Sequence, residues 1–137
     1  MMKRRYLLFV IMMFCALTCS AQTIRNANNS VLARIDYDGT VRSSNNSIVA
    51  RISSSGDIRD NNNHLLGRID SNGDIRNANN SIMGKVENNG VVRNRNNSIL
   101  GRVEADGTIR DSNNHIMGYA KGVSHRYVAI YFFFNFF

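Results

Sequence analysis

The sequence has no proline and no tryptophan, and it has only two cysteines. Both of them, Cys15 and Cys19, lie in an apolar N-terminal segment that is typical of a cleavable export signal. Once that segment is removed, the chain has no disulfide, no cysteine-ligated zinc and no cysteine nucleophile. Large side chains are scarce in the middle of the 137 residues, so we expect one small fold that is thin or repetitive.

Residues 1–21 are predicted to be a secretory signal peptide. Three basic residues at 3–5 precede an apolar run over 6–17, and the small residues Cys19 and Ala21 predict cleavage after Ala21. The run has about 12 residues, whereas a membrane-spanning helix needs roughly 20. We therefore favour cleavage over an anchor, and we expect an exported protein without a transmembrane segment in the periplasm, on the outer surface or outside the cell.

Cleavage also changes the charge of the protein. Lys+Arg falls from 17 to 14 while Asp+Glu stays at 10, so the mature chain carries about +4. This mildly basic balance is compatible with anionic glycans or lipid headgroups without requiring either.

A 17-residue unit is repeated five times through residues 22–122 and is followed by a partial copy. Each copy has an arginine after a β-branched residue, then an Asn-Asn pair, an apolar stretch and a glycine. The arginines are Arg25, Arg42, Arg59, Arg76, Arg93 and Arg110, and the glycines are Gly39, Gly56, Gly73, Gly90 and Gly107. Six Asn-Asn pairs thus alternate with five glycines.

The unit is too short for a helical repeat and fits two short strands with two turns. Alternating apolar residues predict a longer strand over 31–36 and a shorter one over 40–42. Turns such as 36–39 end in glycine, which tolerates positive φ, and the Asn-Asn segments also favour the left-handed conformation. We therefore predict an all-β domain of 17-residue hairpin repeats.

One position in the longer strand is small in every copy. It is occupied by Ala33, Ala50, Gly67, Gly84, Gly101 and Gly118. Small residues within an apolar strand face predict close approach of another backbone. We expect that approach at a crowded ring axis or against the C-terminal segment.

The repeats and the aromatic tail resemble those of the five-fold β-flower proteins, secreted proteins of Bacteroides-type bacteria. The residues that carry the resemblance are GDIRDNNNHLLGRID at 56–70, GTIRDSNNHIMG at 107–118 and YFFF at 131–134. The resemblance covers nearly the whole mature chain. It implies a closed arrangement of hairpins with approximate five-fold symmetry, and it implies no activity. Periodicity alone leaves open whether five or six hairpins are present and whether the ring closes.

Residues 123–137 break the repeat and end in an apolar, aromatic run over 127–137. We predict that this segment packs as a final strand or as a plug against the small-residue column, supplying bulk that the repeats lack. Membrane insertion and self-association are the alternatives. Eleven residues are too few for a spanning helix, and an exposed run of this kind would be prone to aggregate.

The candidate ligand-binding residues are the repeated arginines. Their guanidinium groups suit sulfate, phosphate or carboxylate groups on a polysaccharide or lipid. A second basic position recurs in the longer strand, at Arg34, Arg51, Arg68, Lys85 and Arg102. The structural alternative is a solvated ladder in which these cations pair with repeated acidic residues at about 0.2–1 kcal/mol a pair. No residue is predicted to be catalytic.

Metal, cofactor and nucleic-acid sites are not predicted. The acidic turn at 36–39 resembles the start of a calcium loop, but its copy SSSG at 53–56 has no carboxylate, so a turn is the better interpretation. His64, His115 and His125 form no ligand motif, and no phosphate loop precedes a helix. Stacking aromatics are missing from the repeats apart from Tyr37, which argues against nucleic acid.

The sequence therefore predicts an exported, non-enzymatic binding or envelope-associated structural module. Its partner is expected to be a repetitive polar or anionic ligand such as a glycan, or a component of the cell envelope. The alternative is a self-assembling fibre or matrix subunit, because Asn-rich β-repeats can stack end to end. Closure of the ring would disfavour that alternative, since closure removes free strand edges.

Overall fold

The computed structural model describes residues 22–137, so the predicted signal peptide lies outside the described residues. Within this range, twelve short strands are followed by one helix. The strands are β1 (Gln22–Asn26), β2 (Val31–Ile35), β3 (Thr40–Ser43), β4 (Ile48–Ile52), β5 (Asp57–Asp60), β6 (Leu65–Ile69), β7 (Asp74–Asn77), β8 (Ile82–Val86), β9 (Val91–Asn94), β10 (Ile99–Val103), β11 (Thr108–Asp111) and β12 (Ile116–Tyr119), and the helix is α2 (His125–Phe133).

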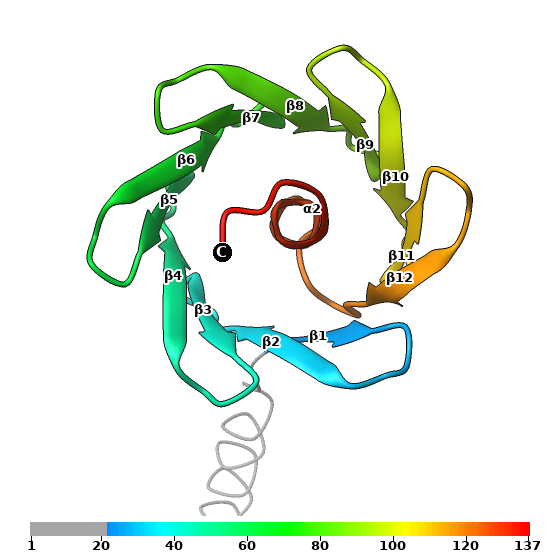
Figure 1. Cartoon of the computed structure of the whole chain (residues 1–137), viewed down its shortest axis with the longest axis horizontal. Helices are drawn as coiled ribbons and strands as arrows, with labels where there is room; N and C mark the ends of the chain where they lie inside the picture. Colours follow the sequence, from blue (N-terminus) through cyan, green and yellow to red (C-terminus); the bar gives the residue numbers. More distant parts are fainter. Residues whose placement is uncertain (1–21) are drawn as a thin grey trace, which may run out of the picture.

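The strands form a closed antiparallel barrel whose hairpins surround α2 like petals (Figure 1). Each Asn-Asn turn closes one hairpin at the outside, and each glycine turn leads to the next hairpin. The ring closes because β1 pairs with β12, with Arg25 opposite Tyr119 and Asn26 opposite Gly118. The predicted closed all-β ring is confirmed. The described strands make six hairpins, and the five glycine turns of the 17-residue repeat join each hairpin to the next.

A β-bulge in each hairpin sorts the side chains between the two faces. In the β7–β8 hairpin, Ile75 lies opposite Gly84, the register then shifts, and Arg76 lies opposite Ile82. Ile75 and Gly84 are buried, whereas Arg76 is half-buried and Ile82 is exposed. The bulge thus leaves isoleucine and glycine on the core side and arginine on the outer side.

The Asn-Asn turns have the predicted left-handed residue. The second asparagine of each pair has φ between 67° and 70°: Asn29, Asn46, Asn63, Asn80, Asn97 and Asn114. Asparagine adopts this conformation more readily than most residues because its short side chain bonds nearby backbone. A side chain at the start of most of these turns accepts further backbone N–H groups, as Asn77 Oδ1 does from Asn79 and Ser81 at 3.0 Å.

The glycine turns link neighbouring hairpins at one end of the ring. Gly73, with φ 95°, accepts the Val86 N–H at 2.9 Å, and the same bond recurs from turn to turn. A further turn, with Gly122 at φ 78°, follows β12, but there the Val123 N–H, not a glycine N–H, bonds the first carbonyl of the turn, that of Ala120. The Gln22 side chain donates a hydrogen bond to the Gly122 carbonyl, which ties the two ends of the ring together.

The C-terminal segment fills the centre of the ring as a helix, not as a strand (Figure 1). The predicted plug is thus present, and the predicted strand is wrong. Because every strand edge of the ring is already paired, a strand in its centre would leave backbone N–H and C=O groups unpaired, whereas a helix satisfies its own. Val128, Ala129 and Ile130 are fully buried against the isoleucines and valines of the strands.

Candidate functional site

The six predicted ligand-binding arginines are bonded into their own hairpins. In each, Nη1 donates to the backbone carbonyl of the left-handed asparagine four residues later, at 2.9–3.2 Å. This carbonyl belongs to a tight turn whose geometry the guanidinium therefore supports. The six arginines are Arg25, Arg42, Arg59, Arg76, Arg93 and Arg110, and they lie on separate hairpins, so the structure does not gather them into one pocket.

Four of these arginines also pair with an acidic residue six positions earlier. Arg42 Nε lies 2.9 Å from Asp36, Arg76 Nε lies 2.8 Å from Asp70, and the equivalent bonds of Arg93 and Arg110 to Glu87 and Glu104 are 2.7 Å.

Arg25 and Arg59 are the two exceptions, because Cys19 and Ser53 stand at that position in the sequence. Arg59 lies instead 3.6 Å from Asp57. These ion pairs are the structural alternative stated above, in which the cations pair with repeated acidic residues, and the constant spacing of six residues between acid and arginine is their signal in the sequence.

The residues at the second basic position form fewer ion pairs than the repeated arginines. Its five residues lie directly opposite the first arginines across the strand ladder: Arg34 with Arg42, Arg51 with Arg59, Arg68 with Arg76, Lys85 with Arg93 and Arg102 with Arg110. Like charges placed opposite each other are destabilising, so this register concentrates positive charge at a cost in stability. We call these ten residues the basic belt.

The ion pairs of the belt are unevenly distributed. Arg68 pairs with Asp57 at 2.9 Å, and Arg102 contacts Glu104 at 3.4 Å and the Asn114 side chain at 2.6 Å. Within residues 22–137, Arg34, Arg51 and Lys85 have no carboxylate at ion-pairing distance. These three are therefore the belt cations that form no ion pair within the described residues.

Acidic side chains in the turns are held in their charged form. The backbone N–H of His64 holds the pKa of Asp60 below its ordinary value, and that of His115 does the same for Asp111. Hydrogen bonds from Thr40 and Thr108 lower the pKa of Asp38 and Asp106. These carboxylates serve as acceptors within turns.

His64 and His115 lie beside single carboxylates, with Nδ1 3.3 Å from Asp60 and 3.5 Å from Asp111. Nowhere in residues 22–137 do three or more His, Cys, Asp or Glu residues form a group suited to a metal ion. The described residues also contain no helix with the length and apolar character of a membrane span.

A family model described as "5-fold beta-flower protein" matches residues 20–137, which include every strand and the central helix. No curated protein and no solved structure gives a significant match.

Proposed function

We propose that this chain, which belongs to the 5-fold beta-flower protein family, is an exported, non-enzymatic module that binds a repetitive polyanion along its basic belt. The observation that carries the proposal is the strand register, which places five pairs of basic residues opposite each other around the ring. Acidic residues of the chain pair with most of these cations, and an anionic ligand would add counter-charge at Arg34, Arg51 and Lys85. An acidic glycan has charges at regular intervals and suits this repetition.

The contacts within the belt make the second basic position a better candidate for ligand binding than the repeated arginines that were chosen from the sequence. Arg42 and Arg76 already bond an acidic side chain and a turn carbonyl, so their charge is paired and their guanidinium groups are held within the hairpin. Arg34 and Arg51 stand opposite repeated arginines without such partners. We therefore expect the second basic position to contribute most of the binding, and the first to hold the hairpins.

A charge-matched comparison tests this proposal. The double variant R34Q/R51Q removes two belt cations, and the control R95Q/K121Q removes two exposed cations outside the belt. We expect heparin, as a model polyanion, to bind the first variant about tenfold more weakly than the wild type and the second nearly normally. Binding should also weaken as the salt concentration rises. Equal losses in the two variants would show that only net charge matters and would refute the belt.

The fibre subunit is the alternative function. Growth by strand addition needs a free strand edge, and each of the twelve described strands has two neighbours in the ring. The geometry therefore favours a closed module. Light scattering after size exclusion tests this: a single species of fixed mass supports the module, and concentration-dependent growth would support the fibre.

A further inference from the structure

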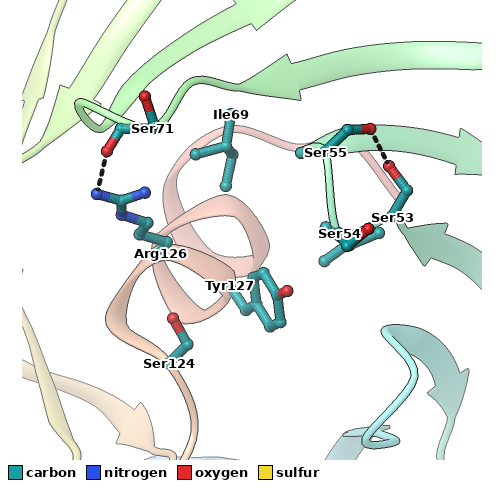
Figure 2. A pocket seen from close by; sticks show the side chains of 10 residues that line it. Ser53, Ser54, Ser55, Ile69, Ser71, Ser124, Arg126 and Tyr127 are labelled. Carbon is teal, nitrogen blue, oxygen red and sulfur yellow. Dashed lines mark hydrogen bonds between the residues drawn. The ribbon is translucent and has the colours of Figure 1, made fainter.

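A hollow opens at the glycine-turn end of the ring, between the start of α2 and two neighbouring turns (Figure 2). Its volume is about 320 Å³, within the usual size range of small-molecule sites. The turn at 53–56 forms one side, Ser71 of the next glycine turn forms another, and Arg126 and Tyr127 of α2 face them. The hollow is distinct from the belt, because it involves other residues at the entrance to the plug.

The lining combines hydroxyl groups with one cation. Serine side chains from both turns, the Tyr127 phenol and the Arg126 guanidinium supply the polar groups, while Ile52 and Ile69 supply apolar surface. No aspartate or glutamate side chain lines the hollow. A few polar groups on a partly apolar wall are typical of sites for small hydroxylated ligands.

Arg126 is oriented but its charge is not neutralised. Its Nη2 donates to the Ser71 carbonyl at 2.7 Å, and its Nη1 donates to the Asp70 carbonyl at 3.4 Å. Both acceptors are uncharged, and within residues 22–137 no carboxylate pairs with this guanidinium. Since arginine has five N–H donors, others remain for a ligand. A carboxylate or sulfate there would gain a charge-assisted hydrogen bond.

The turn at 53–56 differs from its counterparts in a way that suits an anion. The four other glycine turns of the repeat begin with Asp36, Asp70, Glu87 and Glu104, but this one begins with Ser53. Ser53 and Ser55 bond each other through their hydroxyls at 2.8 Å, and Ser54 is exposed between them. The hollow therefore lies between the one repeat turn that lacks a leading carboxylate and the turn that begins with Asp70, whose carboxylate is bonded to Arg76.

We propose that this hollow binds a single acidic sugar residue. Its carboxylate or sulfate pairs with Arg126, its hydroxyls bond the serines of the 53–56 turn, and its apolar face lies against Tyr127. The inference does not depend on the belt, because no residue of the hollow belongs to the belt.

Titration with glucuronate, followed by NMR of the backbone amides, tests the inference, with glucose as the uncharged control. We expect glucuronate to perturb the amides of residues 53–56 and 126–127 with a dissociation constant of about 1 mM. R126Q should weaken binding about tenfold, and R95Q, which removes an exposed cation elsewhere, should leave it unchanged. An absence of perturbation at these amides, or equal binding of glucose, would overturn the inference.

A second variant guards against misfolding of R126Q. S54E places a carboxylate at an exposed position on the wall of the hollow and leaves the bonds of Arg126 intact, so we expect it to abolish glucuronate binding. S98E, at an exposed serine of an outer turn, is the matched control. Glucuronate binding that survives in S54E would refute the site. Heparin binding to R126Q reports separately on the belt, so each proposal fails by a different measurement.

Discussion

The Phe134 ring packs directly against Gly84, so that a Cβ atom built on this glycine would lie 2.8 Å from two ring carbons. The relationship recurs around the plug, with Phe136 at Gly67, Phe133 at Gly101 and Phe132 at Gly118. Four successive hairpins thus each accept one aromatic ring where the strand has no side chain. The glycines of the small-residue column thus leave room for the phenylalanine rings of the C-terminal segment.

Gly84→Ala is expected to destabilise the protein by about 1–3 kcal/mol, because the added methyl group meets both the Phe134 ring and the Arg93 carbonyl. The free energy of unfolding in urea measures this cost. Ala50→Gly, the reverse change at the equivalent position of another hairpin, should cost only about 1 kcal/mol. A Gly84→Ala variant as stable as the wild type would contradict the observed packing.

Phe134→Ala is expected to cost about 3–5 kcal/mol, since the ring is only 7% exposed and its removal leaves a cavity beside Gly84. Thermal or chemical unfolding checks this. Tyr37→Ala serves as the control, because Tyr37 is 84% exposed and should contribute less than about 0.5 kcal/mol. Similar losses in the two variants would argue against a plug that supports the ring.

Asn80 tests the left-handed turns. With φ 69°, Asn80→Ala should cost about 1–2 kcal/mol, whereas Asn80→Gly should stay within about 0.5 kcal/mol of the wild type because glycine has no Cβ. Both variants keep the backbone carbonyl that accepts from Arg76. Equal stabilities, measured by urea unfolding, would show that backbone conformation does not account for the asparagine.

Arg76 and Arg51 separate the structural from the binding role. Arg76→Gln loses the 2.8 Å bond to Asp70 and the bond to the Asn80 carbonyl, so we expect a loss of about 1–2 kcal/mol. Arg51→Gln should cost less than about 0.5 kcal/mol. Urea unfolding gives both values. The reverse order would assign the supporting role to the second basic position.

Acid should destabilise the turns through Asp60 and Asp111. Both have a folded pKa below the ordinary 3.8, so their contribution is complete above that pH and is lost as the pH falls through the folded value. The double variant Asp60→Asn, Asp111→Asn keeps an acceptor oxygen, as Asn77 and Asn94 do at equivalent positions.

The unfolding midpoint of this variant, measured at neutral pH and below pH 3.8, should fall less than that of the wild type. An identical fall in both proteins would show that Asp60 and Asp111 do not account for the acid sensitivity.

The family and the repeat were predictable because they depend on short stretches of sequence. The role of the arginines was not, because a guanidinium that binds a ligand and one that supports a turn have the same spacing. Arg42 is distinguished only by its contacts with Asp36 and the Asn46 carbonyl. The hollow beside Arg126 could not be predicted from the sequence either, since it joins residues 55 positions apart in the chain.

The hairpins follow from local sequence, since strand alternation and left-handed asparagines act on neighbouring residues. The small column at Gly84 and its counterparts likewise predicts that another part of the chain packs there. That six hairpins close into a ring is seen only in the folded molecule, because closure depends on the register between β1 and β12, which are far apart in the chain. Closure in turn decided the form of the tail: with every strand edge paired, the β-prone segment at 125–133 satisfies its backbone as a helix.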